Sequence, residues 1–317
     1  MTPRNVIIDC DTGVDDALAL LLALRSPSFN VLGITCVAGN VSLDKVVRNT
    51  LTVVEHSGKS VPVYAGAATS LVGRGRTAEH VHGDDGLGNL GLPAPQGRAE
   101  SESAVAFLVR AFMTAAEPVE LVTLAPLTNV ALALILEPQL AERIPSLVIM
   151  GGDITGGNVT PAAEFNIHSD PEAADVVMRS GIPKTLVPYD VIKAYGTLTA
   201  ANIATLESGP TPWRQVGGRL MRFLLERDTD HLGSADVIGP ADPAAMAVAI
   251  DPGIATVGMY HVAVETRGEH TRGATVVDRR DWVRPGSGAG APNASVVTAM
   301  DTVAYRALVL DTFLRSV

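Results

Sequence analysis

The amino-acid sequence predicts an α/β fold with an open, mostly parallel central sheet flanked by helices. Short apolar runs of β-branched residues, of which residues 6–8 are the first, alternate with longer runs of strong helix formers, of which residues 17–24 are the first. This alternation is typical of parallel strands joined by crossover helices. It continues to residue 187, where the predicted sheet is mostly complete.

Turn residues and helix caps mark where the predicted strands and helices begin and end. Residues 30–37 and 61–64 are expected to be strands, and a helix over residues 42–57 begins with Ser42 as its N-cap. Further strands are expected at residues 119–124, 146–150, 184–187, 257–265, 274–278 and 294–299. Further helices are expected at residues 103–115, 130–136, 170–180, 243–250 and 301–315, with two more inside residues 200–226, broken at Gly209 and Pro210.

Length and charge restrict the kind of protein. The chain has 317 residues, and because no repeat or linker divides it we expect one domain over residues 1–317. Its 34 acidic residues outnumber its 24 basic residues, and the net charge is -10. Neither nucleic acid nor an anionic membrane surface is therefore an expected partner, and a small-molecule ligand fits better.

Two further features concern the cellular compartment. The first 25 residues have no basic segment before an apolar core, and no apolar run reaches the ~18 residues needed to cross a bilayer. We therefore expect a cytoplasmic protein. Cys10 and Cys36 each lie at the end of a predicted strand, without the spacing of a zinc site, so we expect two buried free thiols.

Four carboxylates, Asp9, Asp11, Asp15 and Asp16, lie at the junction of the first strand and the first helix. Ligands of open α/β sheets bind outside the carboxyl ends of strands, so these side chains are expected at a binding site. One aspartate could simply cap the helix, but like charges about 4 Å apart repel by roughly 4 kcal/mol per pair at an effective dielectric of about 20. A hard divalent cation would neutralise the cluster, which predicts a metal site.

Three other segments are expected near the same sheet edge. Asn40 follows the second strand, and two long segments, residues 65–95 and 151–169, lack the periodicity of helices or strands. A loop this long inside a compact domain is usually functional. The first loop contains His82, and the second contains Asn158, Glu164 and Asn166, although an ordinary polar loop explains these three residue types at least as well.

A series of motifs carries a family resemblance. They are IIDCDTGVDDALAL, AGN at residues 38–40, VHGDDGLG, LAPLTNVALAL, VIMGG and NVTPAAEFNIHSDPEAA. In this order, over nearly the whole chain, they resemble the inosine-uridine nucleoside hydrolase family. The resemblance implies an α/β fold, one bound calcium ion (Ca2+), cleavage of the N-glycosidic bond of ribonucleosides in nucleoside salvage, and a homodimer or homotetramer.

The resemblance also implies roles for individual residues. Asp11, Asp16, the backbone carbonyl of Leu124 and Asp242 correspond to the calcium ligands, and Asp9 matches a further acidic position. Asp15 corresponds to the residue that takes a proton from a calcium-bound water. The residues expected to contact the substrate are Asp15, Asn40, His82, Met150, Asn158, Glu164, Phe165, Asn166 and Asp242.

Two positions depart from the family pattern. Thr12 replaces the usual proline, which should alter the turn little because Gly13 keeps the conformational freedom needed there. Ala241 replaces a histidine, and an alanine cannot donate a proton to the departing base. Either another acid takes this role, with His231 as the nearest titratable choice and His82 as the next, or the enzyme relies on base stacking or on an easier leaving group.

Two other functions are compatible with parts of the sequence. In a phosphatase of the haloacid dehalogenase type, Asp9 would be the nucleophile and magnesium the ion, but Asp15 and Asp16 would have no role. A non-catalytic ribose or nucleoside binder could keep the calcium site and lack catalysis because of Ala241. An assay of turnover separates this binder from an enzyme.

Overall fold

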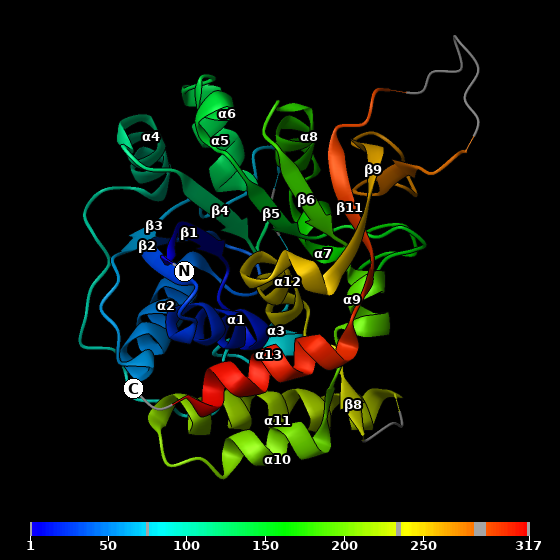
Figure 1. Ribbon diagram of the computed structural model, residues 1–317. Coiled ribbons are helices and arrows are strands. Elements are labelled where there is room, and N and C mark those ends of the chain that lie inside the picture. Colours follow the sequence, from blue (N-terminus) through cyan, green and yellow to red (C-terminus); the bar gives the residue numbers. More distant parts are fainter. Residues whose placement is uncertain (1, 74–75, 233–235, 282–289, 316–317) are drawn as a thin grey trace.

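A mixed sheet forms the centre of the molecule in the computed structural model (Figure 1). The structure describes residues 2–73, 76–232, 236–281 and 290–315, and the side chains of residues 228–232 lie outside that description. The strands are β1 (Arg4–Cys10), β2 (Phe29–Cys36), β3 (Val63–Ala65), β4 (Val119–Thr123), β5 (Leu147–Met150), β6 (Lys184–Val187), β7 (Leu198–Thr199), β8 (Val237–Ile238), β9 (Ala255–Val264), β10 (Thr275–Asp278) and β11 (Ala294–Met300). Within the described residues, nine of them pair in the order β10-β9-β11-β6-β5-β4-β1-β2-β3, and β7 pairs with β8.

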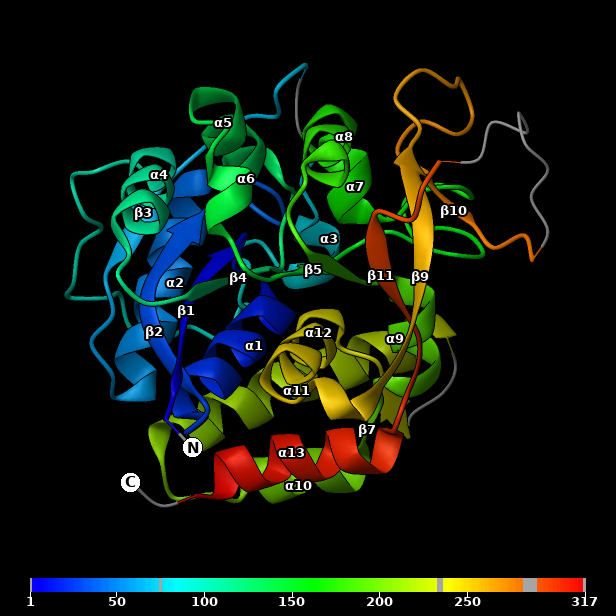
Figure 2. The same ribbon diagram turned by 45° about the horizontal axis from the view of Figure 1, so that its top comes forward.

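Helices cover both faces of this sheet (Figures 1 and 2). One face carries α4 (Ala104–Thr114), α5 (Thr128–Leu136), α6 (Leu140–Arg143) and α8 (Pro171–Arg179). The other face carries α1 (Val14–Arg25), α2 (Leu43–Ser57), α10 (Ala200–Glu207), α11 (Pro212–Leu232), α12 (Ala241–Ile250) and α13 (Thr302–Leu314). Three short helices, α3 (Glu79–His82), α7 (Phe165–Ser169) and α9 (Tyr189–Tyr195), follow strands β3, β5 and β6. The predicted α/β fold is therefore confirmed.

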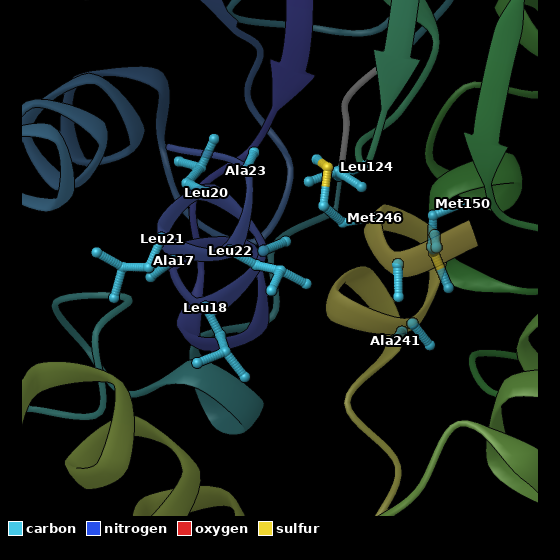
Figure 3. Close-up of a cluster of buried hydrophobic side chains, with 14 of the residues drawn as sticks. Ala17, Leu18, Leu20, Leu21, Leu22, Ala23, Leu124, Met150, Ala241 and Met246 are labelled. Atoms are coloured by element: carbon cyan, nitrogen blue, oxygen red, sulfur yellow. The ribbon is translucent and has the colours of Figure 1, made fainter. Parts of the chain in front are cut away.

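Burial on both faces explains why the strands are continuously apolar. In β1, the side chains of Val6 and Ile8 pack into one core cluster and that of Ile7 packs into the other. Helix α1 lies between the sheet and the outer helices, and its residues from Ala17 to Leu24 are at most 5% exposed (Figure 3). A helix that is apolar on all sides is typical of a buried position, and the acidic turn lies directly before this helix.

The strand order reverses between β1 and β4. From β1 the chain proceeds outward through β2 and β3, and then returns to β4 on the other side of β1 before continuing to β5 and β6. Open α/β sheets bind ligands at such a switch point, outside the carboxyl ends of the strands. The turn after β1 and the residue after β4, Leu124, therefore lie where a ligand is expected.

The structure differs from the sequence prediction in several elements. The sheet is not complete at β6, because β11 joins it in parallel and β9 and β10 extend it in antiparallel pairs. Helices α3, α6, α7 and α9 are missing from the prediction, since elements of four to seven residues are too short to show a helical period. Helix α11 continues to Leu232, past residue 226 where the sequence prediction ended it.

The structure also bears on the two cysteines and on membrane-spanning helices. Cys10 and Cys36 are free and buried, as predicted, and they are direct partners on adjacent strands. Among the described residues, no helix combines the length and the apolarity needed to cross a bilayer.

Candidate active site

The turn between β1 and α1 is fixed by backbone hydrogen bonds to Asp16. This residue lies in the first turn of α1, where its carboxylate accepts from the backbone N–H groups of Asp11 at 3.2 Å and Gly13 at 3.0 Å. Asp16 is therefore a capping residue as well as a member of the acidic cluster. The backbone of Gly13 has φ -96°, so the expectation that its conformational freedom matters is wrong. Glycine is needed there for space, because a Cβ would lie 2.6 Å from Nδ1 of His82.

The loop after β2 contacts the same cluster. The backbone N–H of Asn40 donates to Oδ2 of Asp11 at 2.7 Å, and its side-chain amide donates to Oδ2 of Asp16 at 2.9 Å. A Cβ on Gly39 would lie 2.0 Å from Oδ2 of Asp11, so this close approach of the two loops requires glycine. Asn40 thus orients two carboxylates in addition to its expected contact with the sugar.

Asp242, in the first turn of α12, brings a further carboxylate to the cluster. Asp15, Asp16 and Asp242 each offer an oxygen within 4.8 Å of the others. Burial, and next the charge of a neighbouring carboxylate, raises the pKa of Asp11 and Asp242 well above the usual value and that of Asp16 to about 7. Oδ1 of Asp11 is buried without a hydrogen-bond partner among the described residues. Crowded, buried carboxylates with an unpartnered oxygen fit a hard divalent cation, which prefers oxygen ligands.

Asp9 lies apart from this group. Its Oδ1 accepts from Oγ1 of Thr35 at 2.6 Å and from Nδ2 of Asn129 at 2.8 Å, so it joins β1 to β2 and α5. Burial raises the pKa of Asp9 to about 7. The side chain is fully buried and does not line the cavity described below, which argues against a role as a phosphatase nucleophile.

The loop after β5 presents its polar groups through the short helix α7. Glu164 caps this helix by accepting from the backbone N–H groups of Asn166 and Ile167, and burial raises its pKa to about 7. Nδ2 of Asn166 donates to the backbone carbonyl of Leu124 at 2.8 Å. That carbonyl, expected to face a metal ion, therefore uses one lone pair for Asn166 and has a second one left.

His82 lies at the end of α3, against the start of α1. Its Nδ1 accepts from the backbone N–H of Val14 at 3.1 Å and lies 3.7 Å from Oδ1 of Asp15. Burial lowers the pKa of His82, although the nearby Asp15 opposes this change. The neutral ring with its proton on Nε2 is therefore the favoured form, and it is a hydrogen-bond donor rather than a strong acid.

One cavity of about 680 Å³ joins these elements. Its lining includes all the residues expected to contact the substrate, which are Asp15, Asn40, His82, Met150, Asn158, Glu164, Phe165, Asn166 and Asp242. Ala241 also lines it, and Figure 3 shows Ala241 and Met150 at the α12 side of the buried cluster. Asp11 and Asp16 are fully buried and do not appear in the lining. His231 lies near the end of α11, and its side chain lies outside the described residues.

The sequence prediction missed another part of the lining. Tyr189 and Lys193 come from α9, Thr197 follows that helix, and Arg227 comes from α11. None of these residues belongs to a sequence motif that indicates a binding site. Only their position in the chain could have indicated it, because residues 189–197 directly follow β6 and therefore lie at the same sheet edge as the acidic turn.

The fold and the site together define an α/β protein with an acidic cluster suited to a metal ion and a cavity for a small polar ligand. The family model of the inosine-uridine preferring nucleoside hydrolases matches residues 6–307, and the chain belongs to this family of N-glycosidases. The pyrimidine-specific ribonucleoside hydrolase RihA of Salmonella gallinarum is 38% identical over 301 residues, which are 95% of each chain.

Solved structures agree with this assignment. The plant nucleoside hydrolase PpNRh1 is similar with a TM-score of 0.92 and 31% identity, over 99% of this chain and 100% of that one. The purine-preferring ribonucleoside hydrolase from Gardnerella vaginalis is similar with a TM-score of 0.89 and 31% identity, over 98% of this chain and 99% of that one. These matches confirm the family predicted from the motifs.

Proposed function

We propose that the protein hydrolyses the N-glycosidic bond of ribonucleosides to ribose and a free base, and that it does so with calcium. One observation carries the proposal: the nine expected substrate contacts line a single cavity that also contains carboxylates of the acidic cluster. The hydroxyl groups of a polyol can donate, and the oxygen atoms of asparagine amides and carboxylates can accept from them. The cavity is large enough for a nucleoside-sized ligand.

Calcium fits the donor set of this chain. Asp16 and Asp242, whose oxygens lie within 4.8 Å of each other, would hold it with Asp11 and the backbone carbonyl of Leu124. Oδ1 of Asp11 is an unpartnered buried oxygen among the described residues. Calcium takes about six to eight oxygen ligands, so a water and two vicinal hydroxyls could complete the shell. When bound, the ion supplies a fixed positive charge that neutralises the carboxylates and lowers the pKa of a nearby water.

Asp15 is the residue that we assign as proton acceptor. Its side chain is 17% exposed and lines the cavity, whereas those of Asp11 and Asp16 are fully buried. An accessible carboxylate beside the sugar can take the proton of the attacking water. Around the sugar, the oxygen atoms of Asn40, Glu164 and Asn166 would accept from its hydroxyl groups, because the amide nitrogens of both asparagines already donate within the protein.

Departure of the base is the step for which the site lacks an evident acid. Ala241 carries no proton, and His82 is held neutral by burial and by the N–H of Val14. A proton from His231 stays a prediction. The names of the relatives cover both pyrimidine and purine preference, so both classes of base belong in a test.

A hydrolysis panel tests the proposed function, with free ribose as the readout. Uridine, cytidine, inosine, adenosine and 4-nitrophenyl riboside are incubated with protein that was chelated and then supplied with calcium. We expect ribose release that chelation removes and calcium restores. Full turnover after exhaustive chelation, or zinc in the purified protein, would disprove the calcium assignment. Nucleoside binding without any ribose release would favour the non-catalytic binder.

Three expectations stay predictions beside this proposal. A homodimer or homotetramer can be checked by light scattering during gel filtration. A cytoplasmic location and a role in nucleoside salvage can be checked only in the cell that makes the protein.

A further inference from the structure

The cavity wall beside Ala241 contains a cation without an assigned role, Lys193. Helix α9 packs directly against the segment that leads into α12, because the Cα of Lys193 lies 3.5 Å from where a Cβ on Gly239 would be. Lys193, Gly239 and Ala241 all line the same cavity. Lys193 is therefore a cationic residue of the lining whose backbone lies against the segment that leads to Ala241.

The ammonium of Lys193 is available for a ligand. It forms no hydrogen bond or ion pair with any residue in the described ranges, and the residue is exposed at the cavity. Its charge does act inside the protein, since it opposes the rise in the pKa of Asp153. A lysine has a flexible stem and three N–H donors, so its charged group can follow a ligand in this wall.

Arg227 is a second cation of the lining, and its surroundings differ. Its Nη1 donates to the backbone carbonyl of Val81 at 3.3 Å, and its charge contributes to the lowered pKa of His82. Arg227 therefore supports the wall formed by α3, whereas Lys193 lies on the wall formed by α9 and the segment before Ala241.

We propose that Lys193 is a catalytic residue that stabilises the negative charge of the departing base. This inference rests on the proposed hydrolysis of ribonucleosides. When the bond between the sugar and the base breaks, its electron pair goes to the ring nitrogen of the base, while the water oxygen bonds to the sugar carbon and a water proton goes to Asp15. An ammonium near the base stabilises a charge that develops only in the transition state, which raises the rate.

The test compares leaving groups in the full-length protein. Nucleobases leave poorly as anions, whereas nitrophenolate leaves without help. Lys193→Met should slow uridine and inosine hydrolysis by about tenfold to 100-fold, a smaller loss than is typical for a buried transition-state donor. Hydrolysis of 4-nitrophenyl riboside should change less than about threefold. Lys193→Arg keeps the charge and should retain most of the nucleoside activity, and Lys59→Met, at an exposed site outside the cavity lining, is the matched control.

A series of substituted phenyl ribosides adds a readout that a structural role would not change. In Lys193→Met, the rate should fall more steeply with the pKa of the leaving phenol than in the wild type. Equal slowing of nucleosides and nitrophenyl riboside, or no slowing at all, would overturn the role of Lys193. So would an arginine variant as slow as the methionine variant, or a selective loss found only in Arg227→Met or His231→Ala. If wild-type protein releases no ribose from any substrate, the proposed function itself has failed.

Discussion

The site has an acidic end, which is the carboxylate cluster, and a base end, which is the wall formed by α9 and the segment before Ala241, and the two are built in different ways. At the acidic end, Asp11 and Asp16 are fully buried and accept from backbone N–H groups of the turns after β1 and β2. At the base end, Lys193 comes from α9, is exposed, and belongs to no motif. Buried side chains held by the backbone keep one geometry, whereas exposed ones can be exchanged at little cost in stability.

This comparison predicts that the enzyme discriminates most strongly between substrates that differ in the sugar. 2'-Deoxyuridine should be hydrolysed about 10⁴-fold more slowly than uridine, because a missing hydroxyl leaves buried polar groups of the site without a partner. Values of kcat/KM for the two substrates, measured with calcium present, give the ratio. Equal rates would mean that the acidic end does not hold the sugar, and the orientation of the substrate in the cavity would have to be reversed.

The next largest effect is expected from Asp15→Asn. The amide keeps the shape of the side chain but cannot take a proton, so turnover should fall by at least about 100-fold. The metal content should stay that of the wild type, since the other carboxylates of the cluster remain. Asp44→Asn is the matched control, because Asp44 occupies the first turn of α2 as Asp15 does that of α1, and it is exposed. More than about a tenth of the wild-type rate in Asp15→Asn would exclude a proton-transfer role.

The same difference between the ends explains what could be predicted from the sequence. The acidic end follows a buried strand and starts a buried helix, so local patterns place Asp11, Asp15 and Asp16 together. Asp242 joins them from residues far along the chain, and only the family motif indicated it. Lys193 was missed because a helix of seven residues has no visible period and because its contact with Gly239 depends on packing between distant segments.

At the base end, Ala241→His should have a moderate effect. Ala241 lines the cavity, so a histidine there can reach the departing base and protonate it. Uridine and inosine turnover should rise by about tenfold or less, because Lys193 already stabilises part of the charge, and the gain should be larger in a Lys193→Met background. Ala241→Asn fills similar space without a titrating group and is the control. A gain that also appears with 4-nitrophenyl riboside would assign the effect to sugar positioning instead of base departure.

The smallest expected effect concerns Asp153, a buried acid that is not part of the cavity lining. It follows β5, is 5% exposed, and accepts from the backbone N–H of Asp190 at 3.1 Å, while its Oδ2 has no hydrogen-bond partner among the described residues. Burial, and then the charges of Asp190 and Glu164, raises the pKa of Asp153 to about 8. Calcium at the acidic cluster should not relieve this burial, because Asp153 is not one of the clustered carboxylates.

The sign of the pH effect follows from this raised pKa. The folded protein keeps the proton of Asp153 up to about pH 8, whereas the unfolded chain loses it near pH 4, so the folded state binds more protons in this window and the wild type loses stability as pH rises through it. Asp153→Asn still offers an oxygen to Asp190 and has no charge to bury. Its Tm relative to the wild type should therefore increase between about pH 5 and pH 9, by at least about 2 °C, which corresponds to about 1 kcal/mol for a chain of this size. Differential scanning calorimetry at both pH values measures the change, and added calcium should raise the Tm of both proteins equally. A Tm difference that is constant with pH would show that Asp153 titrates as an ordinary exposed acid.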